Sequence, residues 1–272
     1  MNRLTYAPGM GGDTLSLDCR VMSSGAAQGL RSYEWDYDLG AHSVIAAANV
    51  ARSVSLRVDA QKSLADALIT TLARDVEYNQ TGTLTLDGWH QRAVVPKVST
   101  DEVYRGHVTL VLSVVLLDGY WWREVSKELF AKVSSGGLDY PHDHPHDLGH
   151  SSGRSVIHVG GGLPAPTRIT FRGPCTNPYV IVAGNRYEVD VSVPSGSMVV
   201  LDSMGTRPTA ILYDQYGNGI DKFSLAVRDG GQGGGSYAYE PFPAGSHEVT
   251  WSGGFGMELA WREREVSPPW TR

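Results

Sequence analysis

The chain has 272 residues, of which 41% are hydrophobic and 19% are charged, and it contains 32 glycines and 13 tyrosines. This length is enough for two ordinary domains, and the composition excludes a disordered chain and favours short strands joined by glycine turns. The formal net charge of −6 argues against a surface that grips nucleic acid, and no run of basic residues is visible.

The N-terminal third is predicted to hold strands at residues 14–20, 32–37 and 53–59, separated by glycine-rich or alanine-rich loops. The N-terminus has no apolar segment of signal-peptide length, and the longest apolar run, residues 108–117, is too short to span a bilayer as a helix. We therefore expect a protein that is made and kept soluble, without membrane insertion.

One amphipathic helix is predicted to begin at Ser63, because apolar residues recur there every four positions. The stripe consists of Leu64, Leu68, Leu72 and Val76, widened by Ala65 and Ile69. We expect Ser63 to cap the helix and Asp66 to favour the positive end of its dipole. The helix should pack against a sheet.

After the helix, residues 82–88 and 91–99 predict a hairpin that turns at Asp87-Gly88. A long strand is expected at 103–117, followed by Asp118 and the aromatic run Tyr120-Trp121-Trp122. Both faces of residues 108–117 are apolar. This strand should therefore be buried on both sides or lie against a neighbouring subunit.

A segment poor in core-forming residues follows at 134–154, and it is predicted to be a linker. Within it, His142, His144 and His146 have the donor chemistry to bind one zinc or nickel ion. A catalytic site would also need a carboxylate base and a shaped pocket, which this segment does not supply by itself. A surface linker is the preferred interpretation, and metal binding, adventitious or functional, is the alternative.

The second half predicts eight or nine short strands, which is typical of a sandwich. The clearest segment, 187–193, alternates strictly between apolar and polar residues. Because side chains on a strand point to opposite faces in turn, one set should face the core and the other solvent. The inward set is Tyr187, Val189, Val191 and Val193, and the outward set is Glu188, Asp190 and Ser192.

Three motifs in this order carry a family resemblance: a Gly-Pro-x-x-Asn-Pro turn from Gly173, a Pro-x-Gly return from Pro194 to Asp202, and the segment Pro243 to Trp251. They resemble the C-terminal domain of siphophage distal tail proteins, which form a ring at the tip of a long flexible tail. The Asp-Gly-Tyr-Trp-Trp ending at Trp122 is similar to the end of their N-terminal domain. The sharper motifs cover residues 166–251.

The resemblance implies a mainly β protein. An N-terminal β-barrel-like or split-barrel sheet with one helix would occupy residues 1–133. The linker would follow at 134–154, and a galectin-like β-sandwich would span 155–272.

The same resemblance implies a structural, non-enzymatic subunit of a non-contractile phage tail, without cofactors. Its homohexameric ring would join the tail tube to the tip hub, with contacts to the tape measure protein and to receptor-binding fibres, and genome DNA would only pass through the lumen. It would be assembled in the host cytoplasm and located at the tail tip of the virion. The expected interface residues are Val108, Leu110, Leu112, Val114, Tyr120, Trp121 and Trp122.

Two other function classes stay open. A carbohydrate-binding tail module would use aromatic residues of the sandwich, namely Tyr237, Tyr239, Trp251 and Trp261, although their strand spacing is more typical of core residues. The sugar-binding histidine and arginine that galectins carry around an Asn-Pro pair are absent around Asn177-Pro178. A metal-dependent hydrolase using the histidine segment is the least favoured hypothesis.

Two local features have a simple interpretation. The glycine-rich stretch 229–235 lacks the Lys-Ser/Thr and the helix of a phosphate-binding loop, so it is interpreted as a flexible connection between strands. Cys19 and Cys175 are expected to be free thiols, with a disulfide between them as the alternative.

Overall fold

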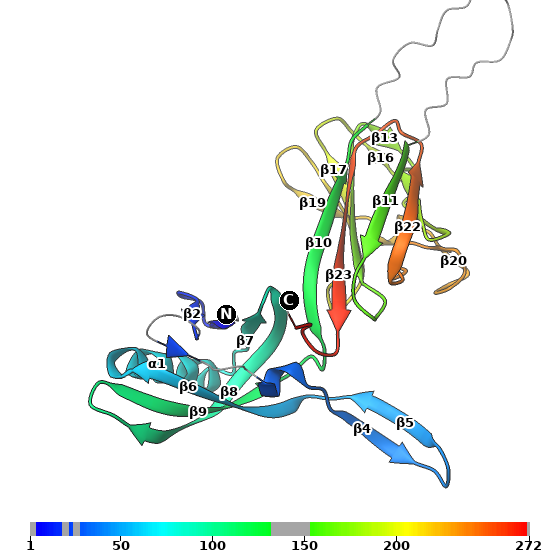
Figure 1. Cartoon of the computed structure of the whole chain (residues 1–272). Helices are drawn as coiled ribbons and strands as arrows, with labels where there is room; N and C mark the ends of the chain where they lie inside the picture. The colour runs from blue at the N-terminus through cyan, green and yellow to red at the C-terminus, as the bar shows by residue number, and fades with distance from the viewer. Residues whose placement is uncertain (1–3, 18–21, 24–27, 132–152, 271–272) are drawn as a thin grey trace, which may run out of the picture. The chain divides into compact units, whose positions relative to one another are not determined.

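The computed structural model describes residues 4–17, 22–23, 28–131 and 153–270, and over these residues the chain is mainly β with one α-helix (Figure 1). It divides into two compact units: Met1–Arg123 with Glu265–Arg272, and Glu124–Arg264. The second unit is therefore inserted into the first, and the chain passes between them twice.

This division differs from the expected boundaries of 1–133 and 155–272 at both ends. Strand β10 (Trp121–Leu129) is hydrogen-bonded to β23 (Met257–Glu265), so most of β10 belongs to the sandwich. The residues that follow β23 belong to the first unit.

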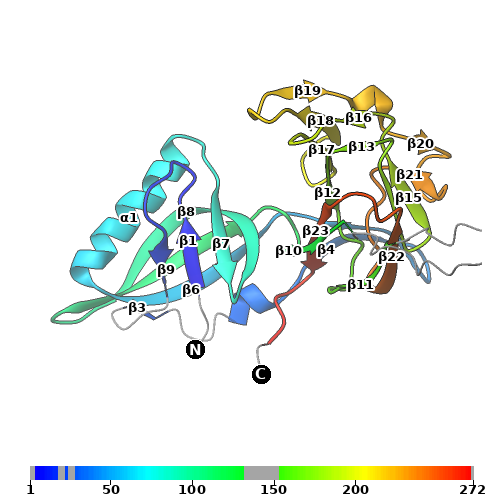
Figure 2. The same cartoon turned by 90° about the horizontal axis from the view of Figure 1, so that it is seen from above.

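The first unit is built on one antiparallel sheet with the strand order β2-β1-β7-β8-β9-β6-β3. Its elements are β1 (Leu4–Ala7), β2 (Leu15–Ser16), β3 (Met22–Ser23), η1 (Gln28–Arg31), β4 (Trp35–Leu39), β5 (Val44–Asn49), β6 (Arg52–Gln61), α1 (Lys62–Glu77), β7 (Gly82–Leu86), β8 (Trp89–Val103) and β9 (His107–Leu116). The end strands β2 and β3 do not pair with each other in the described part of the chain, so the sheet is curved but not a closed barrel there (Figure 2).

Helix α1 packs against β6, β8 and β9, as predicted (Figure 2). Ala65, Leu68 and Leu72 are buried, whereas Leu64 and Val76 are exposed. At 3.6 residues per turn, each four-residue step overshoots a full turn by about 40°, so the stripe drifts around the helix by about 120° between Leu64 and Val76. A strict four-residue stripe therefore cannot face one sheet along its whole length.

The predicted cap is wrong. The helix follows directly from β6, the N-cap position is Gln61, and no side chain caps it. Ser63 lies within the first turn instead.

The predicted hairpin is confirmed. Leu86 pairs with Trp89, and the two residues between them, Asp87 and Gly88, have φ values of 50° and 84°. Two positive φ angles match the twist of the flanking strands, and aspartate followed by glycine adopts them readily. The turn therefore fixes the register of β7 on β8.

Asp75 is a fully buried carboxylate at the end of α1. It accepts hydrogen bonds from the Tyr6 hydroxyl at 2.7 Å and from the backbone N–H groups of Gly9 and Met10 at 3.0 Å each. Burial is the largest cause that raises the pKa of the Tyr6 hydroxyl, and its hydrogen bond to Asp75 is the second. This carboxylate ties the loop after β1 to the helix.

We predict that Asp75→Asn lowers the free energy of unfolding by about 1–3 kcal/mol, because an amide presents an N–H₂ group to at least one of the three donors that the buried carboxylate accepts from. Urea denaturation measures the loss. Asp66→Asn on the exposed side of the same helix is the matched control and should change stability little. Equal effects of the two substitutions would contradict the role of Asp75.

The second unit is a sandwich, as predicted. One sheet has the order β19-β18-β17-β12-β23-β10 and the other β11-β22-β14-β15. The elements are β11 (Gly153–Val159), β12 (Thr167–Arg172), β13 (Cys175–Thr176), β14 (Tyr179–Val182), β15 (Asn185–Glu188), β16 (Ser192–Val193), β17 (Met198–Asp202), β18 (Thr209–Tyr213), β19 (Gly219–Asp221), η2 (Phe223–Leu225), β20 (Arg228–Asp229), β21 (Ser236–Tyr237), β22 (Gly245–Trp251) and β23. Phe171, Val180, Tyr187, Phe242 and Leu259 are among the fully buried residues of its core.

The alternating segment 187–193 has the predicted orientation. Its four inward residues are no more than 9% exposed, and Asp190 and Ser192 face solvent. The segment is not one strand, however, because the backbone changes partner along its length. It pairs with β14 through β15, then bridges Val189 to Ala226, and then pairs with β13 through β16.

We predict that Val191→Asp unfolds the second unit. An unpaired carboxylate in the core costs several kcal/mol against a typical total stability of about 5–15 kcal/mol. Asp190→Val, one position along on the solvent side, should leave the thermal transition almost unchanged. A stable, cooperatively folded Val191→Asp protein would refute this orientation.

Candidate functional site

The residues that the sequence proposed as an oligomer interface lie mainly inside the first unit. Val108, Leu110, Leu112 and Val114 are no more than 8% exposed, and Trp121 is fully buried. Tyr120 and Trp122 are half-buried, and Trp122 packs on His90 with ring centroids 4.7 Å apart. The four β9 side chains face the unit's own core, so they leave no surface for a second subunit.

The other face of β9 explains the misleading pattern. Val111 and Val115 alternate with the buried residues and are half-exposed, with Ser113 between them. Apolar residues on both faces therefore reflect one core face and one partly covered face.

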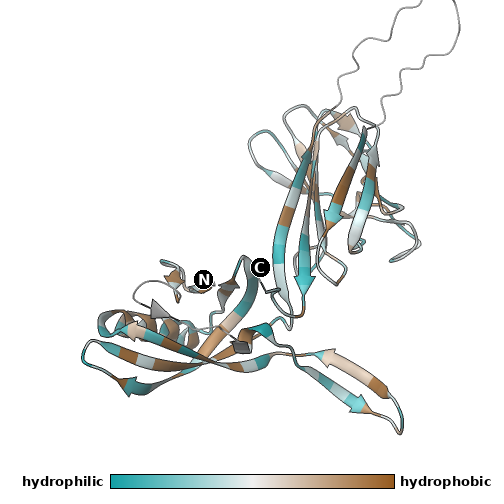
Figure 3. Cartoon of the chain, in the orientation of Figure 1, coloured by the Kyte–Doolittle hydropathy of each residue, from teal (hydrophilic) through white to brown (hydrophobic). Residues whose placement is uncertain are grey.

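A hairpin formed by β4 and β5 carries the most exposed apolar cluster of the first unit, and in Figure 1 it extends away from the rest of that unit. Its exposed members are Trp35 at 38%, Tyr37 at 58%, Leu39 at 67%, Val44 at 58% and Ile45 at 71%. Figure 3 shows apolar residues along β5 and at the turn. We call these five residues the hairpin cluster.

The two faces of this hairpin differ. Trp35, Tyr37 and Leu39 share one side of β4, and Asp36 and Asp38 share the other, where their partners in β5 are alanines. In the described structure β4 and β5 pair only with each other. An isolated two-stranded hairpin is marginally stable in water, so the hairpin cluster is a surface that another chain would stabilise by covering it.

Strand β5 was not predicted, because the alanine-rich residues 44–49 were interpreted as a loop. The signal was the alternation Trp35, Tyr37, Leu39 followed by the β-branched pair Val44-Ile45. The base of the hairpin is anchored by Arg52, whose guanidinium donates to Gly29 O at 3.3 Å and to Ser32 Oγ at 3.0 Å.

The C-terminal segment is held on the first unit by Arg31, whose side chain is completely buried. Its Nη1 donates to the carbonyl oxygens of Pro268 at 3.0 Å and Pro269 at 2.6 Å, and Nη2 forms an ion pair with Asp87 in the β7–β8 turn. The ring of Trp270 lies against the same guanidinium, with the centroid 4.7 Å from Cζ. No motif in the sequence predicted this clasp.

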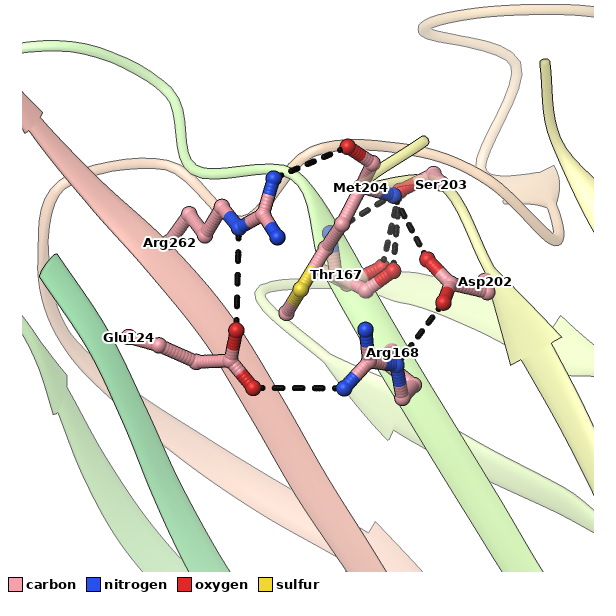
Figure 4. Close-up of polar contacts among 7 residues, drawn as sticks. All are labelled: Glu124, Thr167, Arg168, Asp202, Ser203, Met204 and Arg262. Carbon is pink, nitrogen blue, oxygen red and sulfur yellow. Dashed lines mark hydrogen bonds and ion pairs between the residues drawn. The ribbon is translucent and has the colours of Figure 1, made fainter. Parts of the chain in front are cut away.

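The sandwich carries an ion-pair network on the outer face of β10, β23, β12 and β17 (Figure 4). Glu124 in β10 bridges two arginines: its carboxylate lies 3.2 Å from Arg168 Nη1 and 3.6 Å from Arg262 Nε. Arg168 also pairs with Asp202 at 2.7 Å, and that hydrogen bond raises the pKa of Arg168. The network joins β10 to the strands of the sandwich.

We predict a small, salt-dependent effect for Glu124→Gln. Glu124 and Arg168 are more than a third exposed, so screening by water limits the expected loss of unfolding free energy to about 0.5–1 kcal/mol, and high salt should reduce it further. Urea denaturation at low and high ionic strength measures both quantities. Glu248→Gln is the control, because the Arg154–Glu248 pair is 3.7 Å long and more exposed. A salt-independent loss would contradict an electrostatic role.

His142, His144 and His146 lie outside the described residues, as does Cys19. Among the described residues no group of three or more His, Cys, Asp or Glu is arranged to hold a metal ion.

Cys175 is a free, half-buried thiol whose pKa is raised to about 11 by burial. No helix in the described part of the chain is long and apolar enough to cross a membrane.

Most of the aromatic residues considered for glycan stacking lie in the core, as their spacing along the strands predicted. Trp251, Trp261 and Tyr239 are no more than 5% exposed, and only Tyr237 of the four is partly accessible. The glycine-rich stretch connects β20 to β21, which pair as a hairpin, so it is a connection between strands as predicted.

Comparison with known proteins gives no match to a protein-family model and no match in sequence to a curated protein. Solved structures do match. The Dit protein of phage SPP1, described as a paradigm of the hub adsorption apparatus in phages that infect Gram-positive bacteria, aligns with a TM-score of 0.55 and 11% identity, covering 96% of this chain and 98% of that one. The chain therefore shares the fold of this Dit protein.

Two structures of the phage P2 baseplate in its activated conformation, one with Ca and one with Sr, support the same fold. They align with TM-scores of 0.54 and 0.53 at 10% identity, each covering 97% of this chain and 98% of the matched chain. The Dit fold therefore extends over both units. At such low identity the likeness concerns the fold alone.

Proposed function

We propose that the protein is a structural subunit of a phage tail that forms the distal ring joining the tail tube to the tip hub. The observation that carries this proposal is the hairpin cluster, on a chain that aligns over 96% of its length with the Dit fold. No enzymatic role is proposed, since the pattern of exposed residues fits assembly.

The ring would form through the first unit, by association with further copies of this chain. The hairpin cluster is apolar and exposed, and β4 and β5 have unpaired edges in the described structure. A projecting hairpin that binds the next copy gives a head-to-tail contact, and such contacts close into rings when the rotation between copies allows it. A hexamer is the proposed number of subunits.

The inserted sandwich would serve as a platform for receptor-binding fibres, while the first unit contacts the tail tube, the hub and the tape measure protein. The acidic net charge of −6 suits a ring through which DNA passes without binding. The proposed location is the tail tip of the virion, after assembly in the host cytoplasm.

We predict that the full-length protein forms closed rings and that Tyr37→Asp combined with Ile45→Asp disrupts them, because charges on the hairpin cluster oppose its burial against a second copy. Native mass spectrometry and negative-stain imaging give the oligomeric state.

Tyr216→Asp, at an 80% exposed aromatic residue of the sandwich, is the matched control and should leave the rings intact. Circular dichroism checks that each variant is folded. Rings that persist in the double variant would exclude the hairpin as the interface. A wild-type chain that stays monomeric even with isolated tail tubes would contradict the ring proposal.

A further inference from the structure

The sandwich has a pocket of about 690 Å³ over β18, β19 and the start of η2. Its lining includes Arg207, Thr209, Ile211, Tyr213, Asp221 and Phe223. Ile211 pairs with Asp221 and Tyr213 pairs with Gly219 across the two strands. Since directly paired residues project to the same face of a sheet, these side chains lie on one side of the β18–β19 pair.

Gly219 keeps this pocket open. A Cβ atom at this position would lie 3.0 Å from Ile211 Cγ2 and 3.2 Å from Tyr213 Cε1. Any side chain here would therefore press against the Tyr213 ring and fill the space beside it. Glycine leaves an aromatic ring accessible next to an aliphatic floor.

The walls of the pocket are held in place. Phe223 stacks on Tyr239 with ring centroids 5.7 Å apart, and the Arg228 guanidinium carbon lies 4.6 Å from the Phe223 ring centroid. The backbone N–H of Phe223 donates to Asp221 Oδ1 at 2.8 Å, which orients the carboxylate. Such fixed groups reduce the entropy lost when a ligand binds.

The polar groups at the rim set the charge of a ligand. Arg207 and Asp221 are the two charged residues of the lining, and neither takes part in an ion pair among the described residues. The lining carries one positive and one negative group, so it has no net charge that selects an anionic or a cationic ligand. A guanidinium offers several donors, and the carboxylate and the Thr209 hydroxyl offer acceptors.

We propose that this pocket binds a neutral sugar unit. A pyranose ring has an apolar C–H face, which suits Tyr213 and Ile211, and a rim of hydroxyl groups, which suits Arg207, Asp221 and Thr209. The proposal is independent of ring formation, and it places glycan recognition on an open pocket instead of on Trp251 and Trp261, which are buried.

Saturation-transfer NMR on the full-length protein tests this with methyl glycosides of glucose, galactose, mannose, rhamnose and N-acetylglucosamine. At least one glycoside should bind, with a Kd of about 1 mM or weaker as expected for a single sugar, corresponding to roughly −4 kcal/mol. Gly219→Val, which fills the pocket, and Tyr213→Ala, which removes the stacking ring, should each weaken that binding by tenfold or more.

Tyr216→Ala, in the same β18–β19 connection but outside the lining, is the control and should bind like the wild type. Gly219→Val should still assemble like the wild type, so loss of sugar binding and loss of the ring are separate outcomes. The proposal is overturned if no glycoside binds, if a charged sugar such as glucuronate binds and the neutral ones do not, or if a folded Gly219→Val protein binds equally well.

Discussion

The pairing of β10 with β23 is the constraint on which the organisation of this chain depends. β10 leaves the first unit and becomes the edge strand of one sandwich sheet, and its neighbour β23 leads the chain back. The second unit is consequently an insertion with both of its ends on adjacent strands. The ion pairs of Glu124 reinforce this arrangement at the residue where the second unit begins.

Much of the fold was predictable because local chemistry and tertiary structure agree. Asp87-Gly88 prefers positive φ angles, and the hairpin requires them. The inward and outward residues of 187–193 follow from alternation alone, even though the backbone changes partners there. For α1 the existence of the helix was predictable, but its buried face depended on which residues meet the sheet.

The failures have physical reasons of their own. The apolar strand β9 was interpreted as an interface because burial in the same chain and burial by another chain leave the same pattern in a sequence. β5 appeared as a loop because alanine has little β-propensity. The Arg31 clasp brings together residues more than 200 positions apart, and no local pattern marks such a contact. The pocket beside Gly219 likewise depends on the register of two strands.

The insertion topology also has a mechanical meaning. A force applied to the sandwich is passed to the first unit along two routes, a covalent one through β10 and a noncovalent one through the contacts of the C-terminal segment that follows β23. The second connection ends in the buried guanidinium of Arg31, which is linked to the β7–β8 turn through Asp87. Cleavage of the segment after β23 would leave the sandwich covalently attached through β10, whereas cleavage before β10 would leave it held only by noncovalent contacts, among them those of Arg31 with Pro268 and Pro269.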